Sequence, residues 1–176
     1  MTCEVTAVIY TEENGRYRID CTKAVWSTDS IHALYQNAGI HIQDVDFVIE
    51  GEDYLLLVEY KNANISGASN PNGFRPEDDK KIGDITRKYY DSLHYLTLMG
   101  KDKPKYYIYI LEYPNGDCVT RRRIRNRLKT ELPFSLQEQF EQGVRLIEKI
   151  DVLSIEEWNS DSLYGNYPIL PTTVHT

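Results

Sequence analysis

The amino-acid sequence predicts an α/β protein with a small mixed β-sheet flanked by helices and preceded by an N-terminal β-hairpin. Two apolar runs, residues 46–50 and 54–61, are joined by a short polar turn at residues 51–53, which indicates a central hairpin. Apolar side chains recur at intervals of three and four over residues 81–99, as in an amphipathic helix that lies on a sheet. Residues 105–113 are apolar or aromatic on both faces, as in a strand covered on each side.

The segment before the central hairpin contains signals for another hairpin and for a helix. Asn14 and Gly15 form the dipeptide that most strongly favours a tight hairpin turn. Residues 27–29 can cap a helix, and Gly39 follows that helix at a position where helices often end. We therefore expect, in order, strands over residues 5–10 and 16–21, a helix over 29–37 and a short strand over 40–42.

The segment after the central hairpin begins with a loop over residues 62–79 that is rich in Gly, Asn, Ser and Pro. Loops of this length in a compact domain tend to be functional. Ser135 with Glu138, and Ser154 with Glu157, form capping-box patterns that open helices. The elements expected after the loop are a helix over 81–99, a strand over 105–113, helices over 119–132 and 135–142, a strand over 144–153, a helical turn from 154 and a tail over 159–176.

The 176 residues suffice for one domain with a substantial core. We expect a single domain with its core at about residues 28–113, followed by C-terminal helices and a strand over 119–158. Cys3, Cys21 and Cys118 are odd in number and lack the spacing of zinc ligands, so they are expected to be reduced thiols. No segment has a signal-peptide pattern or membrane-spanning length, so the expectation is a soluble cytoplasmic protein without a membrane partner.

The formal net charge of −7 is unevenly distributed along the chain. Residues 80–129 contain 13 Lys and Arg against 5 Asp and Glu, a balance of +8, and the remaining residues contain 7 against 22, a balance of −15. Electrostatic fields are local on the scale of the Debye length, about 8 Å in physiological salt. The acidic total therefore does not exclude a polyanionic partner for the basic half.

The central hairpin is predicted to bring together three charged residues. If its loop consists of two residues, counting outward from the turn places Asp46 directly opposite Glu59, and opposed residues share a face. Lys61 lies two residues further on the same strand and hence on that face. A three-residue loop would break this arrangement, and a four-residue loop would place Asp44 opposite Glu59 and make Asp44 the ligand.

Two carboxylates side by side, supported by a backbone carbonyl, suit Mg²⁺ or Mn²⁺. Such an ion lowers the pKa of bound water and neutralises charge on a phosphoryl oxygen. Asp46, followed after a spacer by Glu59-Tyr60-Lys61 on the next strand, resembles the PD-(D/E)xK metal-dependent nucleases. The resemblance spans about residues 28–113 and implies a restriction-endonuclease-like core. It also implies that Asp46, Glu59 and the Tyr60 carbonyl bind the metal and that Lys61 assists the attacking water.

The resemblance implies a magnesium-dependent nuclease that hydrolyses phosphodiester bonds of DNA. The chain departs from the family pattern in having Val45 before Asp46 and in having no Glu within residues 29–37. One alternative is a nuclease-fold protein without catalysis that binds nucleic acid or a protein partner. Another is a structural module in which Lys61 alone neutralises both carboxylates.

Basic residues on the two predicted helices are candidates for contacts with nucleic acid. Arg87 and Lys88 belong to the helix over residues 81–99. Residues 121–127 contain five Arg, and the candidates among them are Arg121, Arg122 and Arg125. Arginine forks fit phosphate oxygens, and counterion release would add affinity for DNA. The alternative is a solvated helix face whose arginines pair with acidic residues elsewhere in the chain.

Overall fold

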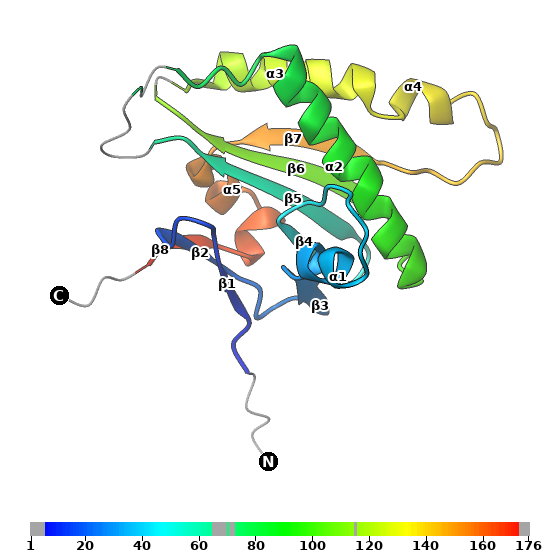
Figure 1. Ribbon diagram of the computed structural model, residues 1–176, viewed down its shortest axis with the longest axis horizontal. Coiled ribbons are helices and arrows are strands. Elements are labelled where there is room, and N and C mark those ends of the chain that lie inside the picture. Colours follow the sequence, from blue (N-terminus) through cyan, green and yellow to red (C-terminus); the bar gives the residue numbers. More distant parts are fainter. Residues whose placement is uncertain (1–5, 65–69, 71–72, 115, 173–176) are drawn as a thin grey trace.

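The computed structural model describes residues 6–64, 70, 73–114 and 116–172, which form two β-sheets and the surrounding helices (Figure 1). A five-stranded sheet has the order β3-β4-β5-β6-β7, and a three-stranded sheet has the order β1-β2-β8. The strands are β1 (Ile9–Thr11), β2 (Tyr17–Asp20), β3 (Trp26–Thr28), β4 (Phe47–Glu50), β5 (Leu55–Asn62), β6 (Lys105–Glu112), β7 (Lys149–Leu153) and β8 (Ile169–Pro171). The helices are α1 (Ile31–Asn37), α2 (Asp79–Leu98), α3 (Cys118–Glu131), α4 (Phe134–Gln137), α5 (Ile155–Ser160) and the 3₁₀ helix η1 (Tyr164–Asn166).

The five-stranded sheet is mixed. β3, β4 and β5 pair antiparallel, whereas β6 pairs parallel to β5 and β7 pairs parallel to β6. Parallel neighbours need a crossover connection, and α2 and α3 provide the two crossovers. The expected α/β class with a mixed sheet and flanking helices is confirmed.

The two faces of the large sheet are covered by different elements (Figure 1). Odd-numbered residues of β5, such as Leu55 and Leu57, pack in the core formed with α1, α2 and α3. Even-numbered residues, such as Leu56 and Val58, pack in a second core with α5, η1 and the small sheet. Because successive side chains of a strand alternate between faces, odd-numbered residues of β5 share one face with the even-numbered residues of β4 that they oppose.

Several predicted elements occur close to their expected positions. The N-terminal hairpin is β1 and β2, although it belongs to the small sheet and is completed by β8. α2 is followed by Gly100, whose φ of 65° is the left-handed conformation that ends helices. At α5 the predicted capping box forms, with the Ser154 and Glu157 side chains each bonded to the other's backbone N–H.

One expected strand is absent from the structure, and two later elements are shorter than expected. Residues 40–42 form no strand, and the short strand of the large sheet, β3, precedes α1 instead of following it. The backbone after residue 42 bonds to α2: the N–H of Gln43 donates to Asp91 and that of Val45 donates to Ser92 Oγ. These bonds take the place of a strand ladder.

The predicted helix over 135–142 and strand over 144–153 are shorter than expected. α4 ends at Gln137 and is capped at Pro133, without the capping box proposed from Ser135. β7 begins only at Lys149, because the N–H groups of Leu146 and Ile147 donate to the Gln137 side chain and not to a neighbouring strand.

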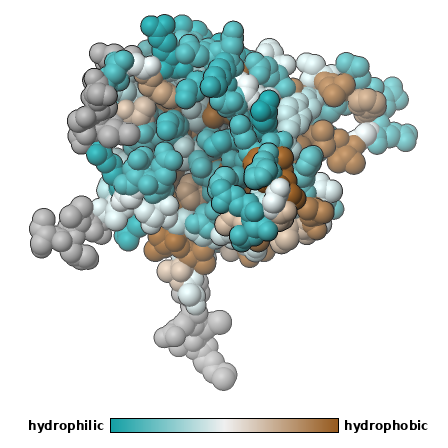
Figure 2. Space-filling view, in the orientation of Figure 1, coloured by the Kyte–Doolittle hydropathy of each residue, from teal (hydrophilic) through white to brown (hydrophobic). Residues whose placement is uncertain are grey.

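Figure 2 shows a largely hydrophilic face over α2, with hydrophobic side chains gathered where α4 and the following loop project from the body. The exposed apolar residues of this projection include Leu136, Phe140 and Val144. Within the described part of the chain, no helix is both long and apolar enough to cross a membrane.

Candidate metal centre at the end of the central hairpin

The register of the central hairpin places Asp46 opposite Glu59. Gly51 donates its N–H to the carbonyl of Tyr54 across a two-residue loop, and Phe47 pairs with Val58. Continuing this register by one residue brings Asp46 against Glu59 in a non-hydrogen-bonded pair, in which Cα atoms are about 4.5 Å apart.

The alternative ligand, Asp44, lies outside this pair. Its Oδ1 atom is 2.9 Å from Nδ1 of His32 on α1. The two-residue loop therefore places Asp46, and not Asp44, opposite Glu59, as the sequence predicted for a loop of that length.

Glu59 is buried and only half satisfied. Its residue exposure is 5%, and Lys88 on α2 donates from Nζ to its Oε1 atom over 2.7 Å. The other oxygen, Oε2, is buried and has no hydrogen-bond partner among the described residues. Burial, followed by the charge of Asp46, raises the pKa of Glu59 from 4.5 to about 8 against the opposing effect of Lys88.

Asp46 links the two strands through the backbone. Its Oδ2 atom accepts the N–H of Tyr60 over 2.8 Å. Because the N–H and C=O of one residue point to the same side of a strand, the Tyr60 carbonyl is directed toward the end of β4, where Asp46 lies. Burial raises the pKa of the Asp46 carboxyl, which Lys88 and the Tyr60 N–H oppose.

Lys61 does not act as the counter-ion of Glu59. Its side chain is 38% exposed, and its ammonium group lies 3.5 Å from Oε1 of Glu13 in the β1-β2 turn. The cation bonded to Glu59 is Lys88. The alternative in which Lys61 alone neutralises both carboxylates is therefore wrong. Lys88 comes from the helix above the sheet and directly precedes Tyr89 of the buried stripe.

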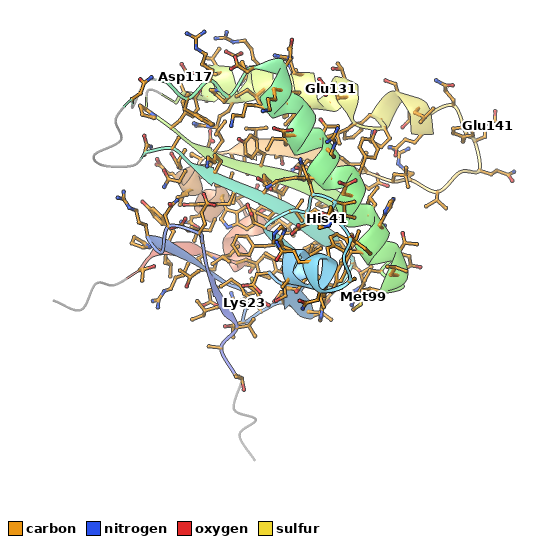
Figure 3. All side chains as sticks on the ribbon, in the orientation of Figure 1. Lys23, His41, Met99, Asp117, Glu131 and Glu141 are labelled. Carbon is orange, nitrogen blue, oxygen red and sulfur yellow. The ribbon has the colours of Figure 1, made fainter. Side chains whose placement is uncertain are left out.

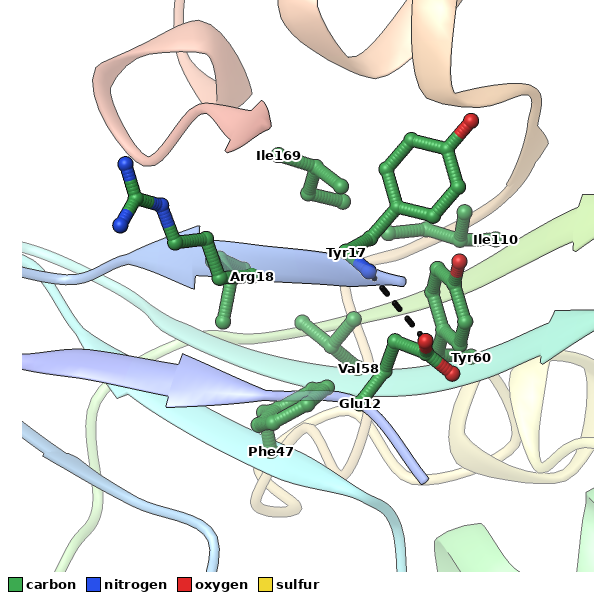
Figure 4. Close-up of a pocket in the computed structure, with 9 residues that line it drawn as sticks. Glu12, Tyr17, Arg18, Phe47, Val58, Tyr60, Ile110 and Ile169 are labelled. Carbon is green, nitrogen blue, oxygen red and sulfur yellow. Dashed lines mark hydrogen bonds between the residues drawn. The ribbon is translucent and has the colours of Figure 1, made fainter. Parts of the chain in front are cut away.

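The N-terminal hairpin brings the Glu13 carboxylate near Asp46, which the sequence patterns did not indicate. The Glu12 side chain accepts the N–H groups of Asn14, Arg16 and Tyr17, and Figure 4 shows the last of these bonds. This fixed turn holds Glu13 close enough to raise the pKa of Asp46 as a lesser cause. The only sequence signal was the pair of acidic residues before the Asn-Gly turn.

A cavity of about 160 Å³ adjoins Asp46 at this end of the hairpin. Its lining comes from the β1-β2 turn, from the segment before α1 and from the central hairpin. The lining residues are Thr11, Glu12, Glu13, Asp29, Asp46, Phe47 and Tyr60. The cavity is therefore bordered mainly by carboxylates, which favour a cation over an anion as its occupant.

The donor set suits a cation that keeps much of its water. In the described ranges, no three or more His, Cys, Asp and Glu side chains form a group able to hold a metal ion. The resemblance would use two carboxylates and one carbonyl, from Asp46, Glu59 and Tyr60, with water completing the shell, which is the kind of ligand set that Mg²⁺ prefers. The unpartnered Oε2 of Glu59 fits this set, because a buried carboxylate oxygen without a partner is costly.

The candidate nucleic-acid residues differ in exposure and in their bonding partners. Arg87 is exposed on α2, whereas Lys88 is bonded to Glu59. Arg121 is 8% exposed, and its Nε donates to Glu157 over 2.9 Å. Arg122 is exposed and Arg125 is half-buried. Arg121 is thus occupied by an acidic partner, as the alternative interpretation of the arginine run expected.

Searches of protein-family models, of curated proteins and of solved structures found no match to this chain.

Proposed function

We propose that the protein is a magnesium-dependent nuclease, with a PD-(D/E)xK-like site, that hydrolyses phosphodiester bonds of DNA. The observation that carries the proposal is the second oxygen of Glu59, buried beside Asp46 without a partner among the described residues. A purely structural glutamate at this depth would be expected to have both oxygens bonded. A divalent ion would satisfy the free oxygen and lower the cost of two neighbouring carboxylates.

Each residue has a role in the proposal. Asp46, Glu59 and the Tyr60 carbonyl hold Mg²⁺, which when bound supplies charge neutralisation at a phosphoryl oxygen and a lowered pKa of water. Lys88 holds the Glu59 carboxylate in place through its 2.7 Å bond. Lys61, more exposed and only loosely paired with Glu13, is the cation available to contact the scissile phosphate.

The alternative is a nuclease-fold protein without catalysis that binds nucleic acid or a protein. The Lys88–Glu59 ion pair favours it, because the ammonium group already supplies positive charge beside the two carboxylates. Under this alternative, binding of a divalent ion would add little stabilisation, and the Lys88–Glu59 ion pair serves only to fix α2 on the sheet.

Calorimetry with Mn²⁺ tests the metal site directly. The proposal expects saturable binding that Asp46→Asn and Glu59→Gln abolish, whereas Asp44→Asn, a matched loss of one carboxylate near the hairpin, retains it. Equal binding by all three variants, or none by the unaltered protein, would contradict the metal site.

Cleavage of supercoiled plasmid in Mg²⁺ separates the nuclease from the non-catalytic alternative. We expect Lys61→Ala to abolish cutting with metal affinity unchanged, since its role is at the phosphate. Lys88→Ala should change metal affinity as well, because it frees Glu59. Metal binding without cutting of plasmid or single-stranded DNA would favour the non-catalytic alternative.

A further inference from the structure

The arginine-rich helix α3 has two chemically different flanks. The flank toward α2 is neutralised: Arg127 pairs with Asp79, and Arg123 lies 3.8 Å from Glu77. Arg121 points toward α5, where Glu157 binds it. These three arginines therefore contribute little free positive charge at the surface.

The other flank has cations without acidic partners. At 100° per residue, Arg122, Arg125 and Lys129 fall within about 60° of arc on α3. None of the three forms an ion pair with any residue in the described ranges: Arg125 donates to the Asn126 side chain, and Lys129 lies 5.4 Å from the centre of the Phe134 ring. We call these three residues the basic flank.

A groove of about 300 Å³ runs between α3 and the start of β7 beside the basic flank. Arg125, Lys129 and Lys149 contribute its cations. Its two acids are already engaged, since Glu148 pairs with Arg145 and Asp151 pairs with Lys149 and accepts the Tyr164 hydroxyl. The free charge bordering the groove is therefore positive.

We propose that the basic flank and its groove bind the phosphate backbone of double-stranded DNA at a surface separate from the metal centre. Arginine forks and a lysine in one row suit phosphate oxygens. From Arg122 to Lys129 the helix rises about 10 Å, comparable to three phosphate-to-phosphate steps of about 3.4 Å axial rise along one strand.

The position of the flank supports a role apart from the chemistry. α3 packs over β7 at one edge of the large sheet. Lys88 and Glu59, in contrast, meet between α2 and β5. In Figure 3, the labels Asp117 and Glu131 mark the two ends of α3. Elsewhere the chain is acidic and repels a polyanion, so this surface would also orient the duplex. The proposal rests on the proposed function only for the choice of DNA as the polyanion.

Fluorescence anisotropy with a labelled 20-base-pair duplex, in EDTA and from 50 to 200 mM KCl, tests the proposal without the metal centre. The variant Arg122→Gln/Arg125→Gln should bind roughly tenfold more weakly and reduce the slope of log K against log salt by about 2. The matched control, Arg123→Gln/Arg127→Gln, removes the same charge from the other flank of the same helix and should leave both values close to those of the unaltered protein.

Two results would overturn the proposal. Equal loss in both double variants would mean that the helix attracts DNA by its total charge and not by one flank. Displacement of the duplex by poly-glutamate at equal charge concentration would mean that the flank recognises an acidic polypeptide. Because Asp46→Asn retains duplex binding if the flank acts alone, failure of the metal centre and failure of this surface are distinguishable.

Discussion

Two buried glutamates on the same face of the central hairpin have opposite environments. Glu50 lies near the turn and Glu59 at the far end, with exposures of 6% and 5%. Glu50 has both oxygens paired, Oε1 with Lys103 over 2.9 Å and Oε2 with Lys101. Burial opposes its ionisation, but the two lysine bonds outweigh that effect and hold its pKa below the usual value.

Among the residues that the structure describes, Glu59 has a single lysine partner, a neighbouring carboxylate and an unpaired oxygen, and its pKa is raised. Burial of a carboxylate is therefore not what distinguishes a candidate site from a structural ion pair. The difference is whether the surrounding chain satisfies the charge. At Glu50 it does, whereas at Glu59 one carboxylate oxygen has no partner among the described residues.

The largest expected difference between the two glutamates is in pH dependence. Folding raises the pKa of Glu59 from its ordinary value of 4.5 to about 8. Between these two pH values, Glu59 is therefore more protonated in the folded protein than in the unfolded one. The free energy of unfolding should then fall as pH rises, by about 3 kcal/mol from pH 5 to 8. Urea denaturation in EDTA measures this fall.

The Glu59→Gln variant should remove most of that slope, because glutamine resembles the protonated acid and does not titrate. Glu50 has the opposite sign: its lowered pKa gives stability that is present above its ordinary value and is lost only as pH falls through the folded pKa. Glu50→Gln should therefore leave the slope between pH 5 and 8 in place. An unchanged slope in Glu59→Gln would refute the assignment.

A divalent ion should stabilise the protein through Glu59 and not through Glu50. At about 100 times its dissociation constant, Mn²⁺ should raise the free energy of unfolding by about 2.7 kcal/mol at pH 7.5. The corresponding rise in melting temperature on adding Mn²⁺ should vanish in Glu59→Gln and persist in Glu50→Gln. A similar shift in both variants would indicate non-specific binding to an acidic surface.

The hairpin was predictable because its signals are local. The apolar runs and the polar turn predicted the hairpin, and for the two-residue loop that the structure has, counting outward places Asp46 opposite Glu59, as predicted for that loop length. α2 and β6 were predictable for the same reason, since each has a long, regular apolar pattern. The strand predicted over residues 40–42 is absent because the backbone that follows it bonds to α2 side chains, which no local pattern reveals.

The site was only partly predictable because its other members come from distant segments. Lys88 reaches Glu59 across 29 positions, and Glu13 approaches Lys61 from the N-terminal hairpin. Strand parity assigns a face to a residue of the sheet, but it does not say which helix residue lies above that face. The predicted loop over residues 62–79 falls partly outside the described residues, at 65–69 and 71–72.

The smallest of the three effects compares the two glutamates where neither metal nor titration intervenes. At pH 5.5 in EDTA, Glu50→Gln should lower the free energy of unfolding by about 2 kcal/mol, because it removes the charge that Lys101 and Lys103 share. The value should fall below that of a fully buried pair, since these lysine side chains are 21% and 30% exposed. Glu59→Gln should change stability by less than half as much, because Glu59 is mostly protonated at this pH. Equal losses, measured by urea denaturation, would mean that Lys88 alone satisfies Glu59 as fully as two lysines satisfy Glu50, and the unpaired oxygen would then have no need of a cation.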